Sequence, residues 1–113
     1  MQAIALMRRG AGIDELNRIK LDVPAIVNSH QVLIKVAYSS LNPVDYKLIA
    51  NQPTFWHYPY IPGLDLAGQV VAIGANVTAV QIGDNVAVHA DLSHGGALAE
   101  YILQPDTYYL KSQ

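Results

Sequence analysis

Apolar and polar residues alternate along most of the chain, and this is the period of β-strands. The clearest case is the segment "QVLIKVAYSSL", in which Val32, Ile34, Val36 and Tyr38 share one face. Shorter stretches with the same period, bounded by glycine, proline and other turn residues, predict further strands. These stretches cover residues 1–7, 15–23, 64–73, 85–90, 96–105 and 107–111.

One helix is predicted, beginning at Asn42 or Pro43 and ending near Ala50. Asparagine is a favourable N-cap, proline suits the first helical position, and Asp45 adds a carboxylate to the first turn. Short strands, frequent turns and a single small helix predict a mainly β fold. A barrel or a sandwich is favoured over a parallel α/β sheet.

Composition limits the class of protein. The 113 residues are 51% hydrophobic and 14% charged, as expected for one globular domain with one core. The net charge is −2 without clustered Lys or Arg, which argues against nucleic acid or an anionic membrane as partner. There is no cysteine, no secretory pattern and no apolar run near the ~18–20 residues that span a bilayer. We therefore expect a cytoplasmic protein.

Two apparent motifs do not support a site. "GAGIDE" has Gly10 and Gly12 at the spacing of a dinucleotide-binding turn, but Glu15 stands at the third glycine position and a strand pattern follows. A hairpin turn is the better interpretation. The histidines are scattered and lack the helical i,i+4 pairing of a zinc site. They are His30, His57, His89 and His94.

The stretch "YPYIPGLDLAGQVVAIG" is unusual for a core strand. Pro59 and Pro62 favour an extended approach, Gly63 allows a tight turn, and Gly68 permits a bend or the close approach of another backbone. A kinked barrel strand explains these residues. It does not explain Asp65, because a carboxylate among leucines needs a donor or exposure to water.

Three segments in this order, "NPVD", "PYIPGLDLAGQVVAIGANV" and "GDNVAV…GGALAEYI", resemble the N-terminal catalytic domain of the medium-chain dehydrogenase/reductase superfamily. The resemblance is strongest to its zinc-independent, quinone oxidoreductase-like branch and runs from Met1 to about Leu110. It implies a GroES-like fold, which is a partly open β-barrel with one or two short helices.

The resemblance also implies chemistry without a metal. Zinc-dependent members have a ligand Cys where this chain has Asn42, and a ligand His where it has Leu64. Where this chain has Val44, they have a proton-relaying Ser or Thr, and where it has Asp65, they have a Glu. A catalytic zinc needs about three protein ligands, and these positions do not supply them.

The same resemblance suggests site residues. Asn42 is expected to act in catalysis and beside the cofactor, by donating a hydrogen bond to a developing oxyanion, although N-capping of the helix is an equal alternative. Tyr46 is a second catalytic candidate. Phe55 and Trp56 are the aromatic pair of the expected cleft wall, and packing of the loop is an equal alternative role for them. The expected substrate-cleft residues are Phe55, Trp56, Leu64 and Asp65.

The implied function is hydride transfer from NADPH, or NADH, to a quinone, an enone or a related carbonyl-conjugated acceptor. The superfamily carries a Rossmann cofactor domain downstream, so residues 1–113 are expected to be a fragment of a longer enzyme. Alone, the chain is expected to be inactive and to self-associate through its exposed cleft face. The alternative is a stand-alone, non-catalytic GroES-like binding or assembly module.

Overall fold

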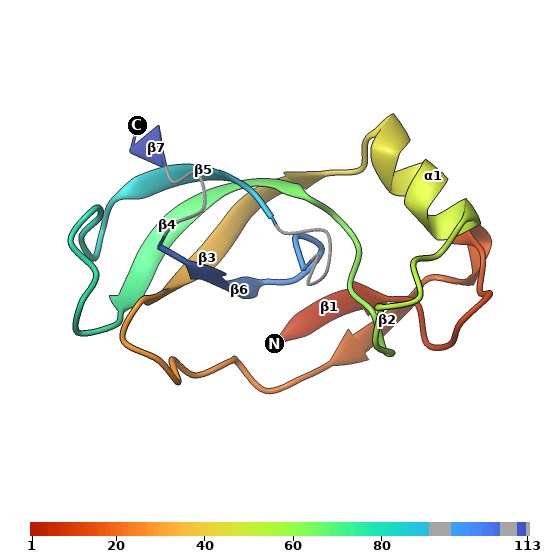
Figure 1. Cartoon of the computed structure of the whole chain (residues 1–113), viewed down its shortest axis with the longest axis horizontal. Coiled ribbons are helices and arrows are strands. Elements are labelled where there is room, and N and C mark those ends of the chain that lie inside the picture. Colours follow the sequence, from red (N-terminus) through yellow and green to blue (C-terminus); the bar gives the residue numbers. More distant parts are fainter. Residues whose placement is uncertain (91–95, 107–110, 113) are drawn as a thin grey trace.

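The computed structural model describes residues 1–90, 96–106 and 111–112 as two antiparallel sheets and one α-helix (Figure 1). A two-stranded sheet pairs β1 with β2, and a five-stranded sheet has the order β6-β3-β4-β5-β7. The strands are β1 Gln2–Ala5, β2 Asn17–Lys20, β3 Gln31–Ser40, β4 Asp65–Ile73, β5 Asn85–His89, β6 Tyr101–Pro105 and β7 Lys111–Ser112. The helix α1 is Pro43–Ala50, and η1, Ile13–Glu15, is a single 3-10 turn.

The predicted mainly β fold is confirmed, with sheets that stay open instead of closing into a full barrel. The helix begins at Pro43 as the N-cap and proline signals predict. Six predicted strands correspond to β1 to β6, and the stretch 107–111 falls mostly on 107–110, outside the described residues. Among the described residues, no helix has the length and apolar character needed to cross a membrane.

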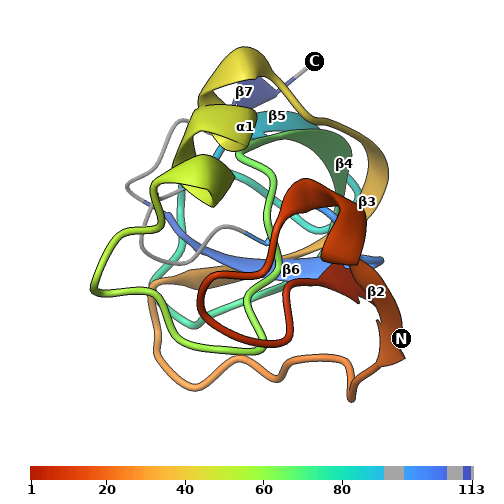
Figure 2. The same ribbon diagram turned by 90° about the vertical axis from the view of Figure 1, so that its right-hand side faces the viewer.

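The core consists of two apolar clusters. The larger one combines residues of the five-stranded sheet, such as Val32, Ile34 and Val70, with residues of the connecting segments, such as Leu64 directly before β4. The smaller one lies where α1 and the segment after it meet the start of the chain, and Trp56 stacks on Tyr60 there with ring centroids 3.7 Å apart. Figure 2 shows α1 beside the connection between β1 and β2.

A bulge and a glycine set the register between β3 and β4. Val36 pairs with Gly68 but Tyr38 pairs with Ala67, so Ala37 is an extra residue on β3. A Cβ at position 68 would lie 2.3 Å from the Lys35 carbonyl oxygen and 2.8 Å from Ile34 Cγ2. The predicted close backbone approach at Gly68 is therefore confirmed.

The close contact of Gly68 with Lys35 and Ile34 predicts that Gly68→Ala is destabilising. The added methyl group forces β3 and β4 apart, so we expect the free energy of unfolding to fall by about 1–3 kcal/mol. Chemical denaturation measures it. Gly12→Ala is the matched control, because its Cβ would meet only the end of the exposed Asp14 side chain, at 3.0 Å. Equal losses in the two variants would contradict the packing described here.

Candidate functional site

The ends of three neighbouring strands, β3, β4 and β5, lie side by side at one end of the five-stranded sheet. The last residue of β3, Ser40, pairs with the first residue of β4, Asp65, and Asp65 pairs with the last residue of β5, His89. Residues paired across adjacent strands point to the same face and lie close together. The register therefore gathers a hydroxyl, a carboxylate and an imidazole in one row, immediately before α1 begins.

Asp65 binds two side chains at once. Its Oδ2 accepts a hydrogen bond from Asn42 Nδ2, and its Oδ1 lies 2.8 Å from His89 Nδ1. The Asp65 and His89 side chains are 45% and 58% exposed. The carboxylate therefore has two hydrogen-bond partners and is also exposed to solvent. This explains how the strand tolerates a charge between Leu64 and Leu66.

Asn42 is held from two directions. Its backbone N–H donates to the Asp45 carboxylate at 2.7 Å, and Asp45 is buried in the first turn of α1. Its side-chain Oδ1 accepts a hydrogen bond from Ser40 Oγ at 3.4 Å, while Nδ2 donates to Asp65. Asn42 occupies the N-cap position as predicted. Its carboxamide, however, is oriented by the strand ends.

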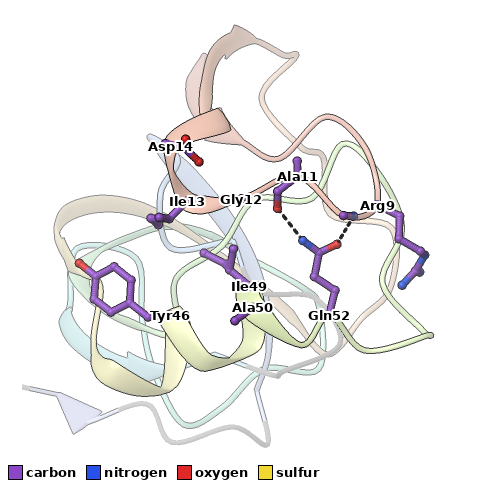
Figure 3. A pocket seen from close by; sticks show the side chains of 10 residues that line it. Arg9, Ala11, Gly12, Ile13, Asp14, Tyr46, Ile49, Ala50 and Gln52 are labelled. Carbon is purple, nitrogen blue, oxygen red and sulfur yellow. Dashed lines mark hydrogen bonds between the residues drawn. The ribbon is translucent and has the colours of Figure 1, made fainter.

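Tyr46 lies one turn further along α1, half exposed, and lines a cavity of about 560 Å³. Figure 3 shows Tyr46 and Gln52 at opposite sides of this cavity, with Ile13 and Ile49 between them. The cavity is lined by residues 9–14 and by part of the 46–52 segment, and Asn42 and Asp65 are not among the lining residues. The two catalytic candidates are one helical turn apart, and of the two only Tyr46 borders this cavity.

The expected cleft residues do not form one surface. Asp65 is accessible in the row of strand ends, and Phe55 is half exposed in the segment after α1. Leu64 and Trp56 are buried, in the larger and the smaller core cluster respectively. For Trp56 the observed environment is that of the loop-packing alternative. Contact of these residues with a substrate stays a prediction.

The two glycine amides of the turn near the N-terminus are already hydrogen-bonded within the chain. The Gly10 N–H donates to Gln52 Oε1 at 2.9 Å, and the Gly12 N–H donates to Glu15 Oε1 at 3.2 Å. The turn joins two antiparallel strands, as the hairpin interpretation requires. The phosphates of a dinucleotide therefore do not fit here, because the donors that would bind them are taken and a carboxylate lies beside them.

Ser40 and His89 are the members of the row that the sequence did not single out. A lone histidine at a strand end carries no sequence signal until the register shows which residue lies opposite. His94 lies outside the described residues. Within residues 1–90, 96–106 and 111–112, no group of three or more His, Cys, Asp or Glu side chains is placed to share a metal ion.

Residues 28–113 match the alcohol dehydrogenase GroES-like domain. The chain belongs to this family. The matched region contains every residue of the row at the strand ends and excludes the glycine turn. The observed open sheets are the GroES-like architecture that the resemblance implied.

Individual members of the wider family are similar over nearly the whole chain. Quinone oxidoreductase of Lama guanicoe is 39% identical over 94% of this chain and 32% of its own length. The structure of quinone oxidoreductase from Coxiella burnetii is 30% identical, with a TM-score of 0.81 over 93% of this chain and 34% of that one. Escherichia coli quinone oxidoreductase, solved in complex with NADPH, is 20% identical with a TM-score of 0.80, over 97% of this chain and 33% of that one. This GroES-like domain therefore spans about a third of the length of such relatives.

Proposed function

We propose that this domain forms the substrate side of the active site of a zinc-independent, NAD(P)H-dependent oxidoreductase. The reaction is hydride transfer to a quinone, an enone or a related carbonyl-conjugated acceptor. The observation that carries the proposal is the Asn42 carboxamide, which Ser40 and Asp65 hold in one orientation at the start of α1. Fixed hydrogen-bond donors of this kind stabilise charge as it develops in a transition state.

The names of the compared proteins support this reaction class. The Lama guanicoe and Coxiella burnetii proteins are quinone oxidoreductases, and the Escherichia coli one was solved with NADPH. We therefore favour NADPH over NADH, with Asn42 beside its reactive end. Of the cofactor, only this uncharged end fits the residues of the candidate site, because the Asn42 carboxamide offers it both a donor and an acceptor. The Gly10 and Gly12 amides, which could have faced a phosphate, are already bonded to Gln52 and Glu15.

The remainder of the cofactor would be bound by a downstream Rossmann domain. Support comes from the length of the relatives, of which this chain spans about a third. A domain of that kind supplies the helix N-terminus and close backbone approach that a pyrophosphate needs. In its absence, we expect exposed side chains such as Tyr46 and Phe55 to favour self-association.

Within this domain, Asn42 acts on the acceptor and Asp65 acts on Asn42. A carboxamide nitrogen carries two N–H groups, so when one is bonded to Asp65 the other can donate to the acceptor's carbonyl oxygen. When bound, the nicotinamide supplies the hydride. The task of this chain is to orient the acceptor and to stabilise the negative charge that appears on its oxygen.

The test is Asn42→Ala in the full-length protein, with NADPH and a panel of quinones and enones. We expect the wild type to oxidise NADPH, and we expect kcat to fall about ten- to a few hundred-fold in the variant because one oxyanion donor is lost. Asn51→Ala is the matched control, since it removes the same side chain at the other end of α1.

Two results would contradict the proposal. Loss of stability in Asn42→Ala with unchanged kcat would assign the residue a structural role only. A folded wild-type protein that oxidises NADPH with none of the acceptors would instead favour the non-catalytic binding module.

Zinc-independence is a separate part of the proposal and has its own test. Support comes from the residue types, because Leu64 is a buried hydrocarbon and the Asn42 carboxamide is already bonded to Asp65. We expect elemental analysis of the purified full-length protein to find no stoichiometric zinc, and chelators to leave its melting temperature unchanged. Bound structural zinc contributes about 10–16 kcal/mol to folding in small domains, so its removal would be evident. One zinc per chain after dialysis would refute this part.

A further inference from the structure

We propose that His89 is the proton donor that completes the reduction of the acceptor. This inference rests on the proposed oxidoreductase function and adds to it a catalytic residue that neither the sequence nor the family match assigns. It is carried by the arrangement of Asn42 and His89 on the two oxygens of a single carboxylate, that of Asp65.

The first observation is the position of His89. It ends β5, directly opposite Asp65 in the register, and Asp65 also binds the amide that is assigned to the acceptor's oxygen. An acceptor bonded to the second N–H of Asn42 would therefore be bound beside the Asp65–His89 pair. The ring is 58% exposed, so it is open both to a small molecule and to water.

The second step is the orientation of the ring. His89 Nδ1 lies 2.8 Å from Asp65 Oδ1, which is hydrogen-bond distance to a group that only accepts. Nδ1 therefore carries a proton in both the charged and the neutral ring. The proton that can be transferred is therefore the one on Nε2. The hydrogen bond from Nδ1 to Asp65 determines that Nε2 is the nitrogen that donates it.

The third step is the chemical balance. Hydride transfer from a reduced nicotinamide forms a C–H bond on the conjugated acceptor and leaves the negative charge on its oxygen. The Nε2–H bond of the His89 imidazolium then breaks and an O–H bond forms, giving the enol or the quinol. The ring becomes neutral with its remaining proton on Nδ1, against Asp65, and Nε2 takes a new proton from water.

A second pair in the same chain provides the comparison. His30 Nδ1 lies 3.0 Å from Asp106 Oδ2, and the His30 side chain is 60% exposed. This pair resembles the His89–Asp65 pair in its distance and in the exposure of the imidazole, although Asp106 is 14% exposed and Asp65 is 45% exposed. Its carboxylate, however, has no Asn42 beside it, and it joins the start of β3 to the end of β6, at the opposite end of β3 from Asn42. It is a surface ion pair without an assigned role in the reaction.

The first experiment is a rescue assay in the full-length protein. We expect His89→Ala to lower kcat with an enone about 100-fold or more, which is the usual contribution of a general acid. Added imidazole should restore at least tenfold of that loss, because the exposed position leaves room for a free imidazole whose protonated form can donate the proton. His30→Ala should stay within about twofold of the wild type, with or without imidazole. His89→Gln keeps a polar side chain there and should be equally slow, which separates proton transfer from packing.

The second experiment does not depend on activity. Nitrogen NMR of the histidine rings in this chain should show the neutral His89 ring protonated on Nδ1, and Asp65→Ala should move that proton to Nε2. A wild-type His89 protonated mainly on Nε2 would overturn the assignment.

The outcomes separate the two proposals. An active wild type with unchanged kcat in His89→Ala, or without rescue by imidazole, overturns the role of His89 and leaves the proposed function standing. A wild type that transfers no hydride overturns the proposed function and the proton-donor role together, and the NMR result then concerns the pairing alone.

Discussion

The cross-strand pairing of Asp65 is the interaction on which the candidate site depends. Side chains alternate between the two faces of a strand, so a slip of one residue would turn a side chain to the other face. The extra residue in β3, Ala37, decides which residue lies opposite Asp65. Without that bulge Ser39 would take the place of Ser40, and Asn42 would be carried one residue further from the carboxylate. Gly68 allows the two backbones to approach closely beside this bulge, which links the packing of the sheet to the chemistry at its edge.

Local sequence patterns were sufficient for the elements but not for the site. Alternation located β3, β4 and β5, and Asn42-Pro43 located the start of α1, because both signals act between near neighbours in the chain. The sequence also indicated that Asp65 needed a donor or exposure to water. It could not name His89, because the pairing of residues 24 positions apart depends on the register of two strands. The burial of Leu64 and Trp56 could not be predicted either, because leucine and tryptophan occur both in cleft walls and in cores.

The two features considered for acceptor and cofactor binding lie in different parts of the structure. The end of the five-stranded sheet provides a carboxamide, a carboxylate and an imidazole, which are groups that stabilise an oxyanion and move a proton. The turn between β1 and β2 has its glycine amides bonded to Gln52 and Glu15, so these two amides are not available to a phosphate. The proposed mechanism therefore assigns the acceptor to this domain and the dinucleotide to another part of the protein.

This division can be measured by titrating NADPH into this chain and into the full-length protein while following nicotinamide fluorescence. The account predicts micromolar binding by the full-length protein and no binding at those concentrations by residues 1–113 alone. Equal affinity in both would contradict it, because the dinucleotide site would then lie within this domain.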